Sequence, residues 1–426
     1  MVKRLALVLI ATAALTAPGV ASADVVTDWN RTMVETLEVD KTPPPPSARV
    51  GAIVQSAVWD AVNGIAHRYT PIHVLSDAPR GASRVAAAAG AAHEALATLF
   101  PAQQATLDQR LADTIAQIAD GSKGDDRSIA EGLQWGKTVA DEILLWRATD
   151  GINMVPPTYA PAGTPGRWAP TPPALVPMPL FRQFATMTPF ALTAPDQFLP
   201  ASPPPLTSAR YARDFNEVKA LGSANSTIRT PEQTQTATFW QSATPTAIWN
   251  RVADDLAQRQ DRSMLANARI LALMNISLAD SMIAIWNAKN TYDTWRPITA
   301  IQQASSDGNP DTSPDRNWTP LLTTPAFQEY PAGHPGVSNA AATVLASFYG
   351  DDTPFTTTSN SLTGVERSFT SFSSAIGQVE NARVWGGIHF RTACVTAAHM
   401  GAEVAQYVTR TRLIPLHEYD RHHDGD

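Results

Sequence analysis

The segment that most limits the fold of this chain is MLANARILALMNISLADSMIAIWNAK, which runs from Met264 to Lys289. Apolar residues lie on nearly every side of a helix drawn through it, and Asp280 is the only formally charged residue between Ile270 and Lys289. A helix that is apolar all round is buried, either in a large core or in a membrane. Polar residues interrupt this one too often for a membrane span: Asn275, Ser277, Asp280 and Ser281. We therefore predict a central buried helix, and because alternating strand patterns are scarce elsewhere, an all-α protein.

Several other segments have helical periodicity. Ser208 is a plausible N-cap for a helix that stops at Gly222, and Thr230 begins a capping box in which Pro231 takes the first helical position. The prolines at 43–46 are predicted to be a spacer before the first helix. No internal sequence repeat is convincing, although two bundles of similar size would fit the length. The remaining predicted helices cover residues 50–65, 86–99, 103–118 and 127–146.

A proline-rich stretch separates two helical regions. Residues 155–205 hold 15 of the 34 prolines, so this stretch cannot be regular helix and is predicted to be an extended strap. Its aromatic residues indicate that it packs onto the helices instead of floating as a linker: Trp168, Phe181, Phe184 and Phe190. We predict a first bundle at roughly 24–150, the strap at 151–207 and a second bundle, with any site, at roughly 208–412.

The N-terminus is typical of a secretory signal peptide. Lys3 and Arg4 precede an apolar run and Ala-Ser-Ala, so cleavage is predicted between Ala23 and Asp24, which gives an exported protein without a membrane span. Loss of these two cations would change the formal net charge from -7 to -9. A chain this acidic has no general basic surface for nucleic acid. Its single cysteine, Cys394, cannot form an internal disulfide.

Three short motifs could carry chemistry. In the first, Lys289 and Arg296 are seven residues apart, about two helical turns, and Pro297 predicts that the helix ends at Arg296. In the second, EYPAGHPG, His334 follows a turn and precedes a helix whose N-terminus would face the imidazole. Taken singly, a lysine at a helix end, a surface arginine and a turn histidine are the simpler interpretations.

The third motif is ARVWGGIHFR, which contains Arg383 and His389. These two residues would not share a face of one helix, so the helix is predicted to begin at Gly386 and Gly387. Arg383 would then approach from a loop and His389 from the first helical turn. The simpler interpretation is a buried histidine with an unrelated arginine upstream.

Together the motifs supply three fixed cations, two imidazoles and a helix N-terminus. Such a set suits a tetrahedral oxyanion, because arginine forks bind oxygens bidentately and Gly333 lets backbone amides approach closely. One histidine could be a nucleophile or a ligand to the central atom, and the other an acid or base.

The sequence resembles the vanadium-dependent haloperoxidases, which share this site with the type 2 phosphatidic-acid phosphatases and the bacterial acid phosphatases. Phosphatases with this site are usually shorter and lack the strap. The resemblance implies an all-α protein with two four-helix bundles and an oxyanion near the second. It covers most of the chain after residue 23 and includes ARVGAIVQSAVWDAVNGI, GRWAPTPPALVPMPL, TPFAL, FLPASPPPLTSARYARDFNEVKALG and RTPEQTQTATFW.

The resemblance also implies roles. Lys289, Arg296 and Arg383 would bind the equatorial oxygens of vanadate beside the Gly333 amide. His389 would bond vanadium from the apical side, and His334 would be the acid–base residue. The implied cofactor is vanadate and not haem, and the implied reactants are hydrogen peroxide, bromide or chloride, and a small organic acceptor. Trp286 and Phe327 match positions that flank the halide site in chloride-oxidising members, or are simply core aromatics.

Two departures weigh against turnover. The family usually has a serine where this chain has Ala332, and losing one hydrogen bond to a charged group costs about 1.5–3 kcal/mol. Many relatives place an aspartate that orients the ligand histidine where this chain has Ala393, and such a loss costs about 10–100-fold in metal affinity. We expect that Glu232 or Asp293 could substitute for that aspartate.

Two alternatives to a secreted vanadate-dependent haloperoxidase therefore stay open. In a phosphatase, His389 would attack phosphorus and His334 would protonate the leaving alcohol. In a non-catalytic protein, the same residues would only bind an oxyanion, as Ala332 and Ala393 would allow.

Overall fold

The predicted central helix is α9, which spans Met264–Tyr292. Every residue from Ile270 to Trp286 is buried, and α9 packs against α2 (Pro44–Ala66), α11 (Gly333–Tyr349) and α13 (Arg391–Thr411). It is long and apolar enough to cross a membrane, but its most apolar window is 94% buried inside the protein. The surrounding helices therefore take the place that lipid would occupy.

The computed structural model describes residues 24–120, 125–241 and 244–416, so the predicted signal peptide at 1–23 lies outside the described residues. The all-α prediction is confirmed, since the only paired strands among the described residues are β1 (Phe355–Thr358) and β2 (Glu366–Phe369), which form an antiparallel pair. The other helices are α1 (Val25–Asp40), α3 (Arg84–Leu99), α4 (Gln104–Asp120), α5 (Asp126–Arg147), α6 (Ala209–Leu221), α7 (Pro231–Phe239), α8 (Pro245–Gln260), α10 (Pro297–Gln302) and α12 (Phe372–Trp385), with short 3-10 turns at Pro101–Gln103, Arg182–Thr186 and Ala304–Ser306.

The helix-start signals were read correctly at two places and wrongly at one. Ser208 caps α6, and Thr230 and Gln233 form the predicted capping box of α7. The prolines at 43–46 are not a spacer, because α2 begins at Pro44. Proline is tolerated in the first helical turn, where its missing N–H has no intrahelical partner to lose.

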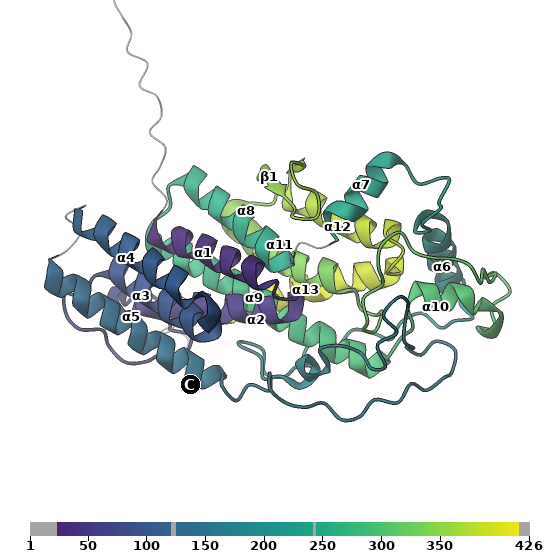
Figure 1. Ribbon diagram of the computed structural model, residues 1–426, viewed down its shortest axis with the longest axis horizontal. Helices are drawn as coiled ribbons and strands as arrows, with labels where there is room; N and C mark the ends of the chain where they lie inside the picture. Colours follow the sequence, from purple (N-terminus) through teal and green to yellow (C-terminus); the bar gives the residue numbers. More distant parts are fainter. Residues whose placement is uncertain (1–23, 121–124, 242–243, 417–426) are drawn as a thin grey trace, which may run out of the picture.

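The helices form two groups that share one core. Figure 1 shows α3, α4 and α5 at one end of the long axis and α6 and α10 at the other, with α9 between them. Residues of α1, α2, α3 and α5 belong to the same buried apolar cluster as residues of α8, α9, α11, α12 and α13. The two-bundle architecture is thus present, while the exact domain limits stay a prediction.

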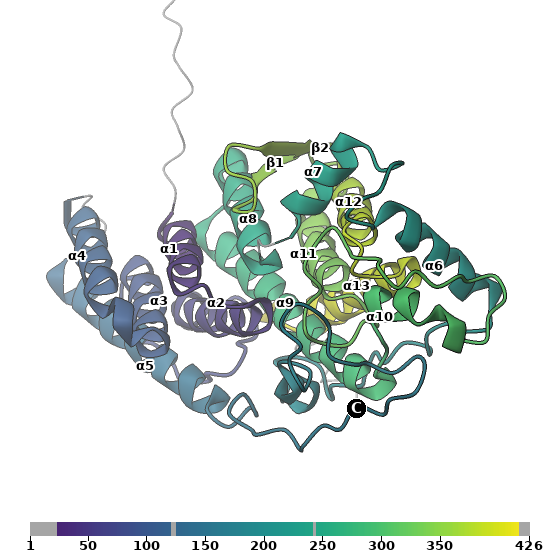
Figure 2. The same cartoon turned by 45° about the vertical axis from the view of Figure 1, so that its right-hand side comes forward.

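The structure reveals an internal repeat that the sequence alone did not make convincing. Asn30 of α1 and Asn250 of α8 lie 220 residues apart, and both stand in a Trp-Asn-Arg sequence. Gln55 of α2 donates to the Asn30 side chain at 2.8 Å, and Asn275 of α9, at the same offset, donates to the Asn250 side chain at 2.8 Å. Figure 2 shows α1 beside α8 and α2 beside α9. The pair α1–α2 is therefore repeated as α8–α9.

The repeat continues in the next helix pair. A Cβ added at Gly136 of α5 would lie 2.2 Å from the carbonyl oxygen of Ala87 in α3, and one added at Gly401 of α13 would lie 1.9 Å from that of Gly336 in α11. Both glycines therefore allow a helix to touch its neighbour's backbone. The pair α3–α5 corresponds to α11–α13, and this match aligns Ser83, the side-chain cap of α3, with Ala332.

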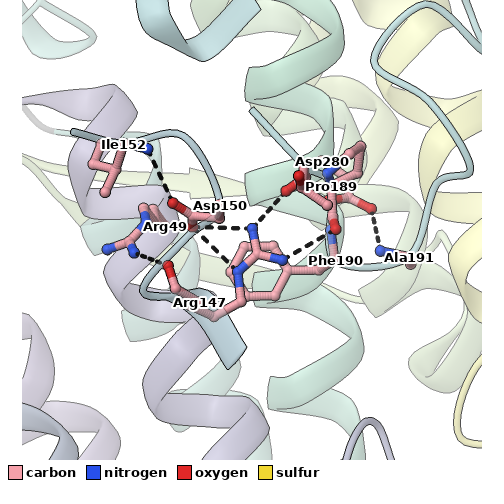
Figure 3. A network of polar contacts seen from close by, with 9 residues as sticks. Arg49, Arg147, Asp150, Ile152, Pro189, Phe190, Ala191 and Asp280 are labelled. Carbon is pink, nitrogen blue, oxygen red and sulfur yellow. Dashed lines mark hydrogen bonds and ion pairs between the residues drawn. The ribbon is translucent and has the colours of Figure 1, made fainter. Parts of the chain in front are cut away.

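The strap is clamped to both groups of helices by a buried polar network (Figure 3). Asp280 of α9 accepts from the backbone N–H groups of Phe190, Ala191 and Leu192 at 2.7–2.9 Å. Arg147, the last residue of α5, donates to the Pro189 carbonyl at 3.1 Å. In Figure 1 the strap runs along the lower side from α5 to α6, and it contains no α-helix, as predicted. Its Trp168, Phe184 and Phe190 are buried.

Replacing Asp280 by alanine should destabilise the protein by about 3–5 kcal/mol, because three buried N–H groups lose their acceptor and Arg147 loses a nearby countercharge. Denaturant unfolding measures this loss. Asp60 of α2 is the matched control, since it accepts from the N–H groups of residues 72–74 in the same way but does not touch the strap. Asp60→Ala should cost a similar amount, whereas only Asp280→Ala should open residues 188–192 to limited proteolysis. Equal cleavage there in both variants would contradict the clamp.

Candidate functional site

Lys289 and Arg296 are held by the end of α9 and the start of α10. The helix does not continue to Arg296 as predicted; it ends at Tyr292, because Asp293 adopts a left-handed conformation with φ 48°. Arg296 is instead the extended residue before Pro297, which begins α10. Both cations are fully buried all the same. The turn therefore brings the guanidinium back beside the lysine, as the motif suggested.

Gly333 and His334 are the first two residues of α11, whereas the sequence analysis placed them in a turn just before that helix. The residue before them, Ala332, takes the N-cap position in an extended conformation and offers no side-chain cap. Free N–H groups at this end carry partial positive charge and favour an anion. A Cβ at Gly333 would approach nothing closer than 3.8 Å, at the Trp286 ring, so the glycine leaves open space on this side.

Arg383 and His389 reach the site differently from the prediction. α12 continues through Arg383 to Trp385, and α13 begins only at Arg391, so the arginine lies in a last helical turn and the histidine in the link between two helices. Gly387 makes this link possible: its φ is +76°, and a Cβ there would lie 2.3 Å from the carbonyl oxygen of Gly222. Only glycine fits both conditions.

The predicted residues surround one small cavity of about 50 Å³. Gly333, His334, Arg383 and His389 line its polar side, while Lys289 and Arg296 are buried against the Phe327 ring, with Lys289 Nζ 5.2 Å and Arg296 Cζ 4.8 Å from its centre. The apolar side contains the two predicted aromatic residues, Trp286 and Phe327. It also contains six residues that were not predicted to line the site: Pro44, Pro45, Phe181, Pro245, Met282 and Pro325. Trp286 and Phe327 are 5.1 Å apart, centre to centre.

Three buried nitrogen atoms at this site have no partner among the described residues: the donors Arg296 Nη2 and Arg383 Nε, and His334 Nε2, whose role as donor or acceptor depends on the tautomer. The other contacts of the cations go mainly to backbone carbonyls, from Lys289 Nζ to Gln328 at 2.7 Å and from Arg383 Nη1 to Trp240 at 2.8 Å. Buried donors are rarely left unpaired in proteins. An oxyanion in the cavity would supply acceptors for both arginine donors.

Burial and mutual repulsion destabilise the charged forms of the site residues when no anion is bound. Burial lowers the pKa of Arg296 to about 9 and that of Arg383 to about 10, so both stay charged at neutral pH. The pKa of Lys289 falls well below its usual value, through burial and then the charge of Arg296. Burial and the nearby cations also hold the pKa of His334 well below 6.5, so its imidazole is neutral. The residues therefore fit a group with several negative oxygens, such as vanadate or phosphate.

Glu329 is the functional residue that the sequence analysis did not identify. Its Oε1 accepts from the Phe390 backbone N–H at 2.9 Å and lies 3.0 Å from His389 Nδ1, and burial raises the pKa of this carboxyl to about 7. Because Oε1 is an acceptor, Nδ1 carries the imidazole proton and Nε2 keeps its lone pair. In this tautomer Nε2 accepts from Arg296 Nη1 at 3.1 Å, at the polar side of the cavity.

The expected substitutes for the missing aspartate are therefore wrong. Glu232 is exposed on α7 and pairs with Arg367, and Asp293 accepts from Tyr159 of the strap. Glu329 fills the role from 60 residues before His389, in the same EYPAGHPG motif that supplies His334. Ala393 carries no acceptor side chain, but its backbone carbonyl accepts from Ala332 N–H at 3.1 Å.

Within the described ranges, no group of three or more histidine, cysteine, aspartate or glutamate side chains could hold a metal ion. His389 Nε2 is thus a single ligand atom among cations. This donor set suits the central atom of an oxyanion and does not suit a free divalent cation.

Comparison with known proteins relates the chain to one group. Residues 269–414 match a family model described as the VCPO second helical-bundle domain. This range contains the polar residues of the site from Lys289 to His389, but not Pro44, Pro45, Phe181 and Pro245 of the apolar wall. The vanadium chloroperoxidase of Curvularia inaequalis is 27% identical over 405 residues, which cover 75% of this chain and 65% of that protein. The chain thus spans just under two thirds of that relative's length.

Two solved structures share the fold. A bacterial vanadium-dependent iodoperoxidase superposes with a TM-score of 0.79 at 25% identity, over 93% of this chain and 98% of that one. A bacterial vanadium-dependent chloroperoxidase in its holo form superposes with a TM-score of 0.66 at 18% identity, over 93% of this chain and 95% of that one.

Replacing Glu329 by glutamine should separate two effects of this carboxyl. Without a carboxylate, His389 no longer holds its proton firmly on Nδ1, so vanadate affinity should fall about 10–100-fold. Phosphate needs no lone pair from His389 to bind, and the loss of a nearby negative charge should leave its affinity unchanged or higher. Calorimetric titration of both anions measures the ratio of the two affinities. Glu232→Gln is the matched control and should change neither, whereas equal changes for both anions in Glu329→Gln would refute the positioning role.

Replacing Ala332 by serine should tighten vanadate binding by about tenfold or more, because one hydrogen bond to a charged group is restored. Pro335 leaves the third helical position without an N–H, so helix capping competes for the new hydroxyl less than usual. The same titration measures the gain. Ala393→Ser, also buried, is the control and should not tighten binding; unchanged affinity for Ala332→Ser would mean that its side chain faces away from the anion.

Proposed function

This chain belongs to the vanadium-dependent haloperoxidase family, and we propose that it binds vanadate beside α9, α11 and the α12–α13 link and uses it to oxidise halide with hydrogen peroxide. The observation that carries the proposal is the set of three unpaired buried nitrogens on three separate elements, two arginine donors and His334 Nε2, together with the lone pair of His389 Nε2. The overall reaction consumes one proton: halide, peroxide and a proton give hypohalous acid and water.

The cations bind and orient the anion. Arg296 Nη2 and Arg383 Nε would donate to its oxygens, and Lys289 would add a charge held in place by two backbone carbonyls. His389 would supply the apical ligand atom, with Glu329 fixing its tautomer. Bound vanadate supplies Lewis-acid chemistry, which makes hydrogen peroxide electrophilic without any change in the oxidation state of vanadium.

His334 would move the proton. Its imidazole is buried and neutral, and Nε2 has no partner among the described residues. Nε2 would therefore accept a proton from hydrogen peroxide and later donate it to the oxygen atom that leaves as water. The charges of Arg383 and Lys289 lower its pKa in the absence of an anion. Negative charge in the cavity would offset these cations, and the pKa of His334 would then rise toward the range that general acid–base catalysis needs.

The aromatic side of the cavity would hold the halide. Trp286, Phe327 and Phe181 present apolar surface beside the cations, which favours a large, weakly hydrated anion over water. The relatives include one protein named as an iodoperoxidase and others named as chloroperoxidases. We therefore extend the proposal from bromide and chloride to iodide, with a small organic acceptor for the product.

We also propose that the protein is exported. This part rests on the N-terminal sequence, with its two cations, apolar run and Ala-Ser-Ala before Asp24.

Purified protein loaded with orthovanadate should halogenate a phenolic dye when given hydrogen peroxide and iodide, bromide or chloride. His389→Ala should lower this rate by more than about a hundredfold, the upper end of losses seen when only a residue supporting a ligand is removed. His399→Ala on the exposed side of α13 is the matched control and should keep the rate. Initial rates with each halide are followed by absorbance of the dye.

A parallel assay tests the phosphatase alternative. Vanadate-free protein should hydrolyse a phosphate monoester slowly or not at all. Hydrolysis that depends on His389, combined with no dye halogenation in any halide, would replace the proposed function with phosphoryl transfer.

A further inference from the structure

A methionine side chain lines the cavity in which the proposed oxidant would form. Met282, Trp286 and Lys289 lie on one face of α9, at spacings of four and three residues. Met282 is 2% exposed and lines the same cavity as His334 and His389. The cavity volume of about 50 Å³ leaves room for only a few water-sized molecules, so a product formed inside touches these walls before it leaves.

Nothing in the proposed reaction uses a thioether. Lys289, Arg296, Arg383 and the two histidines account for anion binding and proton movement. A methionine is nevertheless a readily oxidised side chain, and its flexible, apolar body packs irregular gaps that leucine could also fill. The equivalent position of the first repeat, at the 220-residue offset of Asn30 and Asn250, is Val62, so the packing of the repeat does not itself require sulfur.

We propose that Met282 is a modification site, oxidised to methionine sulfoxide by hypohalous acid before that acid leaves the cavity. This inference rests on the proposed function. The thioether sulfur attacks the halogen, the halogen–oxygen bond breaks, and water delivers oxygen to sulfur, so that thioether and hypohalous acid give sulfoxide, halide and a proton. Sulfur loses two electrons and the halogen gains them.

The sulfoxide would place a polar oxygen in the apolar wall beside Trp286, where the halide is proposed to bind. It would therefore lower the turnover rate, and a methionine sulfoxide reductase would restore it. The fraction of Met282 that is oxidised would thus increase with the number of turnovers that the protein has completed.

Other methionines of the chain provide internal controls. Met154 and Met178 lie in the strap and are 45% and 43% exposed, so oxidant arriving from solution should reach them first. Met274 lies two turns before Met282 in α9 and is 0% exposed, and it does not line the cavity. The order of oxidation therefore reports where the oxidant was made.

The experiment compares two sources of oxidant on the vanadate-loaded full-length protein. In one sample, peroxide and bromide drive turnover in the presence of excess free methionine, which intercepts oxidant in solution, and a parallel sample without it reports dye bromination. In the other sample, hypobromous acid is added directly without peroxide. Peptide mass spectrometry measures the mass gain of about 16 Da, one oxygen atom, at each methionine.

We expect turnover to oxidise Met282 at least about tenfold more than Met274, Met154 or Met178, and added hypobromous acid to oxidise Met154 and Met178 first. With repeated peroxide additions, the rate of Met282→Leu relative to its own starting rate should fall several-fold more slowly than that of wild type, while Met274→Leu, the matched control, should decay as wild type does.

Three results would count against the inference, and they differ in what else they affect. Dye bromination with unmodified Met282 would refute the modification site and leave the proposed function standing. No halogenation with any halide would remove the oxidant, and both proposals would fall together. Met282→Leu decaying as fast as wild type would refute the effect of the sulfoxide on turnover.

Discussion

The site depends on an excess of buried positive charge. Lys289, Arg296 and Arg383 lie within the core, and none of the ion pairs among the described residues involves them; the Glu329 carboxylate contacts His389 instead. Burying a charge costs free energy unless a partner compensates it. A core with this many buried cations therefore needs both hydrogen bonds to backbone carbonyls and the countercharge of an anion. Three segments meet this requirement: the turn after α9, the start of α11 and the α12–α13 link. They bring carbonyl oxygens to the cations and leave two arginine donors and one histidine nitrogen without a partner among the described residues.

The repeat explains how a helical core can carry such a site. Each half uses the same buried contacts, with an amide pair between the first two helices and a glycine contact between the next two. In the first half the position that matches Ala332 is structural, because Ser83 caps its helix. The second half has the same framework, but its helix ends face a cavity. Asp280 accepts hydrogen bonds from the strap near Ala191, and Phe181 of the same strap lines that cavity.

Much of the fold followed from the sequence because its signals are local. The apolar periphery of α9, the capping box at Thr230 and the proline content of the strap each act within one segment. Boundaries were wrong where a single backbone conformation decided them, as at Asp293, or where proline was taken as a break and in fact began a helix, as at Pro44. The repeat was missed because its matching residues are few and are united only by equivalent contacts in space.

The sequence by itself determined the all-α class and the residue types present at the site, because residue types and their order can be recognised without knowledge of the tertiary structure. Only the tertiary structure decided how these residues work together. Glu329 and His389 are 60 residues apart and obey no helical spacing, so their contact exists only because the turn before α11 packs against the start of α13. That packing fixes which imidazole nitrogen keeps its lone pair. It also supplies the carboxylate whose absence at Ala393 had cast doubt on the site.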